Sequence, residues 1–182
     1  SGSVDNRRIG SYGHRYRVDA LFSTVFKELG FNYQLPLDTP LTDRYELSAG
    51  YQSEETDDLF SELTLAQFKR VYVKQDRWTR TWYLKLHQEN FEIADTAGDI
   101  QLVMPGLRWQ QKTADDPIFP KNGFRWMIDL SLAEANLFSD TSLLQARLKG
   151  KWIISPFART RLLLRGDFGA TWIDDFEELP VS

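Results

Sequence analysis

The chain has 182 residues, enough for one domain, and a formal net charge of −4, which argues against a nucleic-acid partner. It contains no cysteine, which excludes disulfides and thiolate metal sites. No apolar run approaches the length of a transmembrane helix. Strands of a membrane β-barrel are only half apolar, so the composition leaves that class open.

Apolar and polar side chains alternate along most of the chain, which predicts long β-strands. Residues 3–7 are compatible with the end of an earlier strand, but their pattern is short. Short connections between strands favour antiparallel neighbours and an up-and-down meander. We therefore expect an all-β fold with about nine long strands: 14–24, 27–37, 43–53, 60–73, 77–91, 100–112, 123–133, 142–154 and 159–174.

Two of these segments depart from simple alternation. In 60–73, Leu63 and Leu65 lie in one register whereas Phe68 and Tyr72 lie in the other, and a β-bulge would explain the change of phase. Pro105 falls within 100–112, and a proline is compatible with a strand only at a sheet edge or a bulge.

The segment 159–174 has the clearest pattern, apolar on one face and ionic on the other. It is far longer than the usual strand of about 5–6 residues and covers the roughly 9–11 residues that a transmembrane β-strand needs. Aromatic side chains also gather near strand ends, as in the interfacial girdles of membrane barrels. They are Tyr16, Trp78, Trp126, Trp152 and Trp172.

Alternation assigns side chains to the two faces of a partial transmembrane β-barrel. The side chains predicted to face lipid are Phe22, Leu84, Ile128, Leu130, Leu148, Leu164 and Phe168. The side chains predicted to face the lumen are Arg17, Asp19, Lys85, His87, Arg125, Asp129, Arg147, Lys149, Arg161, Arg165 and Asp167.

Few residues suggest chemistry. His87 and Glu89 share a strand face beside Lys85 and are compatible with an acid–base or metal pair, but polar lumen residues are the better interpretation. Asp115 and Asp116 are better explained as a solvated loop than as a cation site. No nucleophile, phosphate-loop or metalloprotease motif occurs, so we expect neither an enzyme nor a cofactor. A soluble β-sandwich or barrel that binds lipid or sugar, and a passive porin, remain alternatives.

Four stretches resemble the barrels of TamA-like proteins of the bacterial surface antigen (D15) superfamily, which also includes BamA and the two-partner secretion transporters. They are NRRIGSYGH at 6–14, FNYQLPL at 31–37, Met104-Pro105-Gly106, and GATWIDDFEELP at 169–180. The likeness extends over essentially the whole chain in strand order and loop length.

The resemblance implies a sixteen-stranded barrel in the Gram-negative outer membrane, preceded by periplasmic polypeptide-transport-associated domains. Such proteins insert or translocate outer-membrane and autotransporter proteins, and a TamB-like periplasmic protein is the expected partner beside membrane lipid and client proteins. Residues 1–182 would then form one barrel segment, roughly strands three to eleven. The periplasmic domains, the lumenal Arg-Gly loop and the last strands of the family lie outside it.

Overall fold

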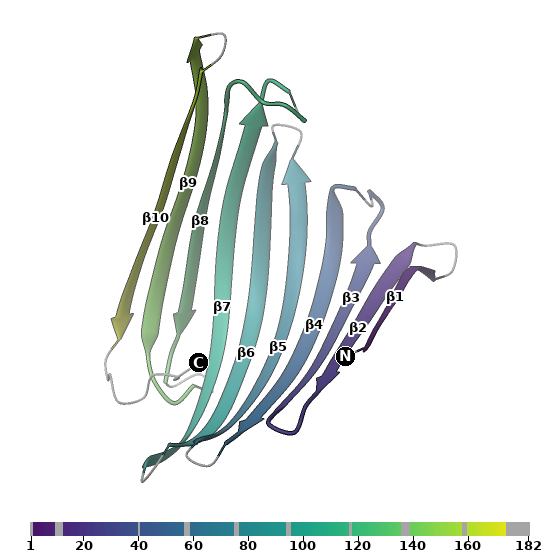
Figure 1. Ribbon diagram of the computed structural model, residues 1–182, viewed down its shortest axis with the longest axis vertical. Coiled ribbons are helices and arrows are strands. Elements are labelled where there is room, and N and C mark those ends of the chain that lie inside the picture. Colours follow the sequence, from purple (N-terminus) through teal and green to yellow (C-terminus); the bar gives the residue numbers. More distant parts are fainter. Residues whose placement is uncertain are drawn as a thin grey trace.

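The protein folds as one antiparallel sheet in which each strand pairs with the next along the chain (Figure 1). No helix occurs among the described residues, and the predicted all-β meander is confirmed. The structure is a computed structural model, and it describes residues 2–9, 13–39, 41–56, 59–74, 77–93, 96–116, 118–135, 139–157 and 160–173.

The described residues form ten strands rather than the nine expected. The additional strand is the first one, where Val4 pairs with Val18 and the short pattern of 3–7 gave only a weak signal. The strands are β1 (Gly2–Ile9), β2 (His14–Phe22), β3 (Phe26–Pro36), β4 (Asp43–Glu55), β5 (Leu59–Lys74), β6 (Trp78–Ile93), β7 (Thr96–Ala114), β8 (Gly123–Ala133), β9 (Leu143–Phe157) and β10 (Thr160–Ile173).

The predicted bulge in β5 is wrong, because its pairing with β4 and with β6 runs without a register shift. β5 instead carries apolar side chains on both faces. Leu63 and Leu65 pair with Glu89 and His87 on one face, whereas Phe68 pairs with Leu84 on the other. The apparent change of phase therefore marks a strand that packs on two sides.

Pro105 lies at a local edge of the sheet, as a proline requires. β7 pairs with β8 only from Gly106 onward, so Pro105 is the first residue outside that ladder. The connection from β8 to β9 covers the open edge below it. The backbone N–H of Val103 donates to Ser139 Oγ at 2.9 Å, and that of Asp140 donates to the Gln101 carbonyl at 2.9 Å.

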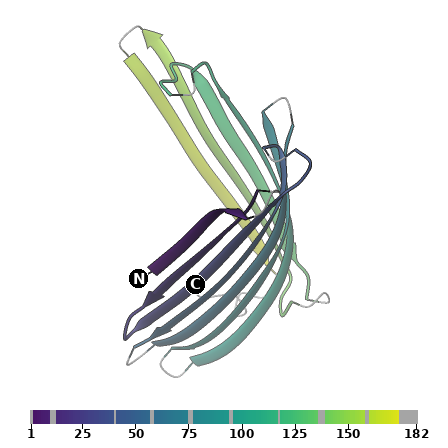
Figure 2. The same ribbon diagram turned by 90° about the vertical axis from the view of Figure 1, so that its right-hand side faces the viewer.

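The sheet is twisted and strongly bent, so that Figure 2 shows it as an open trough. β1 and β10 form its two edges and do not pair with each other. Two glycines of β7 lie under aromatic rings of β6. A Cβ at Gly98 would lie 2.6 Å from the ring of Phe91, and one at Gly106 would lie 2.2 Å from the ring of Tyr83. Only glycine leaves room for these rings, a pairing that sheets use where they curve.

A small apolar core lies on the inner side of the bend. Most of its residues come from the lower half of β7 and the start of β9, and the ring of Phe91 packs against it. Its buried members are Ile100, Leu102, Met104, Ala133 and Leu143. The described residues contain no helix with the length and apolarity needed to cross a bilayer.

Candidate membrane-facing and ionic faces of the sheet

Residues paired across antiparallel strands point to the same face, so the register assigns side chains throughout the sheet. Leu84 of β6 pairs with Phe68 of β5, Phe68 pairs with Leu47 of β4, and Leu47 pairs with Tyr33 of β3, so these four side chains share one face. On the far side of β7, Leu107 of the same face pairs with Leu130. This face is termed the apolar face, and the opposite one the ionic face.

The apolar face exposes large hydrophobic side chains on nine of the ten strands, β7 being the exception. Soluble monomers rarely expose continuous apolar patches of more than a few hundred Å². Phe22 is 70% exposed and Leu148 is 48% exposed. The exposed side chains of this face are Val4, Phe22, Leu29, Leu47, Tyr51, Phe68, Trp82, Leu84, Leu86, Leu130, Leu132, Leu144, Leu148, Trp152, Leu162, Leu164, Phe168 and Trp172.

All seven side chains predicted to face lipid lie on the apolar face. Six of them are exposed, and Ile128 is partly buried between Trp109 and Leu148. On β10 the apolar stretch runs from Leu162 to Trp172. At about 3.3 Å per residue it extends about 33 Å along the strand, or about 25 Å across a bilayer at a strand tilt of about 40°. That height matches the apolar band of membrane barrels; lipid contact itself stays a prediction.

Aromatic side chains form a band on the apolar face, near the end of the sheet where β7 turns into β8. Trp78 and Trp126 pack edge to face with ring centroids 4.9 Å apart. The Trp126 indole N–H donates to Gln111 Oε1 at 3.0 Å, so the one polar group of this apolar side chain has a hydrogen-bond partner. Of the predicted girdle, Trp172 alone lies toward the opposite end. The band consists of Tyr16, Tyr33, Tyr45, Tyr72, Trp78, Trp109, Trp126 and Trp152.

The residues predicted to face the lumen lie on the ionic face, with one exception that the register does not assign. Arg161 has no pairing partner, because the β9–β10 register shifts between Thr160 and Leu162. The others reach the ionic face from β2, β6, β8, β9 and β10. They are Arg17, Asp19, Lys85, His87, Arg125, Asp129, Arg147, Lys149, Arg165 and Asp167.

A polar cluster spans three strands of the ionic face. Tyr83 Oη donates to Asp129 Oδ1 at 2.8 Å, across the side-chain-free Gly106 of the intervening strand. Arg108 Nε donates to Asp129 Oδ2 at 2.8 Å, and its guanidinium lies 5.8 Å from the Tyr83 ring centroid. Contacts that reach over an intervening strand identify this face as the inner side of the bend.

Sequence reasoning selected Asp129 but missed Tyr83 and Arg108. Tyr83 lies in a segment rich in aromatic residues, and its position on the polar face of the alternation was overlooked. The available signal was that Tyr83 shares a face with Lys85, and Arg108 with Lys112, at even spacing.

Asp167 forms the second ion cluster of the ionic face. Its Oδ2 lies 2.9 Å from Arg147 Nη2 and 3.1 Å from Lys149 Nζ, both on β9. On β2, Arg17 Nε donates to both carboxylate oxygens of Asp19 at 2.8–2.9 Å. These side chains are largely exposed, so each pair contributes little to stability on its own.

His87 and Glu89 lie on the ionic face, but they are not solvated there. His87 Nε2 lies 3.2 Å from Glu89 Oε2, and the residues are 6% and 0% exposed. Leu65 and Leu102 flank His87 on the two neighbouring strands. The expectation of polar residues in a watery lumen is therefore wrong for this pair. Among the described residues, no group of three His, Asp or Glu side chains is placed to hold a metal ion.

The loop between β7 and β8 is ordered around two carboxylates. Asp115 accepts backbone N–H groups of Lys121 and Asn122 at 3.0 Å, and Asp116 accepts those of Ile118 and Phe119 at 2.8 and 2.7 Å. These hydrogen bonds hold the loop in its conformation.

The same hydrogen bonds determine how these carboxyls titrate. Desolvation raises the pKa of Asp115, but backbone hydrogen bonds from Asn122, Lys121 and Asp116 outweigh it, and the net pKa lies below the ordinary value. Hydrogen bonds from Phe119 and Ile118 likewise lower the pKa of Asp116.

The sheet thus separates two kinds of surface with one layer of backbone between them. One is apolar and exposed, with an aromatic band near one end. The other is ionic, with hollows of about 480 and 340 Å³ lined by charged side chains. No protein-family model matches the sequence.

Proposed function

We propose that these ten strands form part of the wall of a transmembrane β-barrel, with the apolar face in lipid and the ionic face toward a water-filled lumen. The observation that carries this proposal is the exposed apolar face, which extends across the sheet opposite an ionic inner face. Fully burying a side chain such as leucine or phenylalanine is worth about 1.5–3 kcal/mol. Lipid offers that burial to the whole face at once.

The edges of the sheet set a further requirement. The outer sides of β1 and β10 carry no strand partner within the described part of the chain. Unpaired backbone N–H and C=O groups cost several kcal/mol each in hydrocarbon, so membrane sheets close on themselves. The proposal therefore needs additional strands to pair with both edges, as in the sixteen-stranded barrels that the sequence resembles.

The more specific function we propose is assembly or translocation of outer-membrane and autotransporter proteins in a Gram-negative bacterium. Its support is the sequence resemblance to the TamA-like branch of the D15 superfamily. The mechanism is mechanical: a barrel opens sideways and offers unpaired strand edges to a client strand. In that family the gate lies between the first and last barrel strands, so this segment would supply the wall behind it. A TamB-like protein would be the periplasmic partner.

The decisive experiment reconstitutes the full-length protein into liposomes and measures the insertion rate of an unfolded client β-barrel. We expect faster insertion than into empty liposomes. Ion conductance without any effect on client insertion would favour a passive porin. Quantitative extraction of the protein from cells by buffer without detergent would contradict the membrane assignment and support a soluble binding protein.

A further inference from the structure

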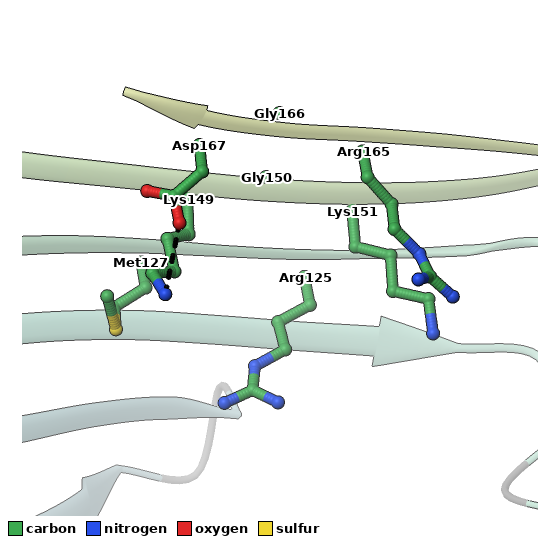
Figure 3. A pocket seen from close by; sticks show the side chains of 8 residues that line it. All are labelled: Arg125, Met127, Lys149, Gly150, Lys151, Arg165, Gly166 and Asp167. Atoms are coloured by element: carbon green, nitrogen blue, oxygen red, sulfur yellow. Dashed lines mark ion pairs between the residues drawn. The ribbon is translucent and has the colours of Figure 1, made fainter. Parts of the chain in front are cut away.

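Four cationic side chains stand directly opposite one another across β7, β8, β9 and β10. Lys112 pairs with Arg125, Arg125 with Lys151, and Lys151 with Arg165. All four point to the ionic face and are exposed. We refer to Lys112, Arg125, Lys151 and Arg165 as the cationic row; Figure 3 shows three of its members from close by.

The row is electrostatically unfavourable by itself. Directly opposed residues have Cβ atoms about 5 Å apart, and like charges in that arrangement destabilise a sheet. Within the described part of the chain, no carboxylate lies at ion-pair distance from any of the four. Of the acids nearest in sequence, Asp129 and Asp167 are already bonded to other cations, and Asp115 and Asp116 accept backbone N–H groups of their own loop.

Composition does not account for this excess, since the chain as a whole carries a charge of −4. The only hydrogen bond from the row to a described side chain is that from Arg125 Nη2 to Gln110 Oε1, at 2.9 Å. Most guanidinium and ammonium donors of the row are therefore available.

The row borders a hollow of about 480 Å³. Lys151 and Arg165 line it on one side, Met127, Lys149 and Asp167 on the other, and Arg125 lies between them (Figure 3). The backbone of Gly150 and Gly166 forms part of its floor. A volume of this size accommodates one or two phosphoryl groups together with what they are attached to.

We propose that Arg125, Lys151 and Arg165 bind a phosphate-bearing ligand of the mono- or diphosphate type in this hollow. Two guanidinium forks and one ammonium present more donors and charge than a single carboxylate satisfies. A phosphate monoester offers three acceptor oxygens and a charge of about −1.5 to −2. The site goes beyond barrel formation and client assembly, neither of which requires it.

The ligand could be a soluble phosphate compound or a phosphorylated lipid, and two titrations distinguish these sources. In the first, inorganic pyrophosphate is titrated into the detergent-solubilised full-length protein by calorimetry. In the second, micelles that contain phosphatidate are titrated into the same protein. Micelles that contain diacylglycerol with the same acyl chains serve as the uncharged comparison. Binding of pyrophosphate alone indicates a soluble ligand; binding that needs phosphatidate indicates a lipid.

Arg165→Ala and Lys151→Ala should each weaken binding about tenfold or more, because each removes charge-assisted hydrogen bonds. Arg15→Ala is the matched control: Arg15 is exposed on the same face but lies on β2, which β3 to β6 separate from the row, and its loss should change affinity less than twofold. In ligand-free protein, Lys151→Ala should not lower the thermal midpoint, since it relieves repulsion between like charges.

Three results would overturn the proposal. The first is no binding of either pyrophosphate or phosphatidate at low salt. The second is equal weakening by Arg15→Ala, which would show general attraction to a positive face. The third is binding of an aspartate-rich peptide without binding of phosphate, which would assign the row to an acidic segment. Arg165→Gln, which keeps polarity without charge, replaces the alanine variant if that variant does not fold.

Discussion

Leu148→Arg distinguishes a membrane wall from a soluble sheet. Leu148 lies on β9, four residues from Leu144 and four from Trp152, which are the outermost exposed side chains that this strand contributes to the apolar face. At about 3.3 Å per residue it is about 13 Å along the strand from each, or about 10 Å in depth at a tilt of about 40°. Leu148 therefore belongs at the centre of the proposed hydrocarbon layer.

An arginine on the lipid face of a barrel costs about 2–4 kcal/mol at the bilayer midplane. That cost lowers the folding equilibrium constant about 30- to 900-fold. In a soluble protein, the same substitution at a side chain that is 48% exposed would fall within about 0.5 kcal/mol of zero. The two settings thus predict clearly different values for one substitution.

Gln145→Arg is the matched control, because Gln145 is exposed on the ionic face of the same strand. Its arginine would point to water in either setting, so we expect a change below about 0.5 kcal/mol. The free energy of unfolding is measured by urea titration of the full-length protein in phospholipid bilayers, with heat-modifiable gel mobility as the readout. Equal stability of the Leu148→Arg and Gln145→Arg proteins would refute the assignment of the two faces.

Further predictions concern the inner face and one loop. Gly106→Ala should destabilise the sheet by about 1–3 kcal/mol, because its Cβ would collide with the Tyr83 ring, whereas Gly150→Ala meets open space and should be neutral or stabilising in the same urea titration. Tyr83→Phe and Asp129→Asn should show a coupling energy of about 1 kcal/mol in a double-mutant cycle; additivity within about 0.3 kcal/mol would mean that their hydrogen bond adds no stability. Because the folded-state pKa of Asp115 is lowered, its contribution is complete above the ordinary value of 3.8 and lost as the pH falls through the lower folded value. Amide exchange in its loop should accelerate over that range, and Asp115→Asn should remove this pH dependence.

Much of the fold follows from a period of two in the sequence. Alternation placed nine of the ten strands and put side chains such as Leu164 and Arg165 on opposite faces, because the pleat directs successive residues to opposite sides. β1 was missed as a full strand because Val4 is its one large apolar residue before Ile9. The bulge predicted in β5 was wrong because the prediction assumed that only one face of the strand is apolar, whereas this strand has apolar side chains on both faces.

The contacts that matter most on the inner face depend on register, which single-strand patterns do not contain. His87 is buried because Leu65 and Leu102 lie beside it on the neighbouring strands, and Glu89 lies between Leu63 and Ile100 in the same way. The cationic row likewise exists only because the register of four neighbouring strands places Lys112, Arg125, Lys151 and Arg165 directly opposite one another. A register shift of one residue between any two of these strands would move the side chains of one strand to the other face.

Register also gives the inner face an electrical asymmetry. On β2 to β5, the ionic face balances Arg15, Arg17, Arg44 and Lys69 against Asp19, Glu28, Glu46 and Glu54. On β7 to β10, it sets Arg108, Lys112, Arg125, Arg147, Lys149, Lys151 and Arg165 against Asp129 and Asp167 alone. A concave surface with low-dielectric walls focuses such a field and raises the local concentration of counter-ions. An anion that enters the trough is therefore drawn toward β7–β10, where the cationic row has donors left to bind it.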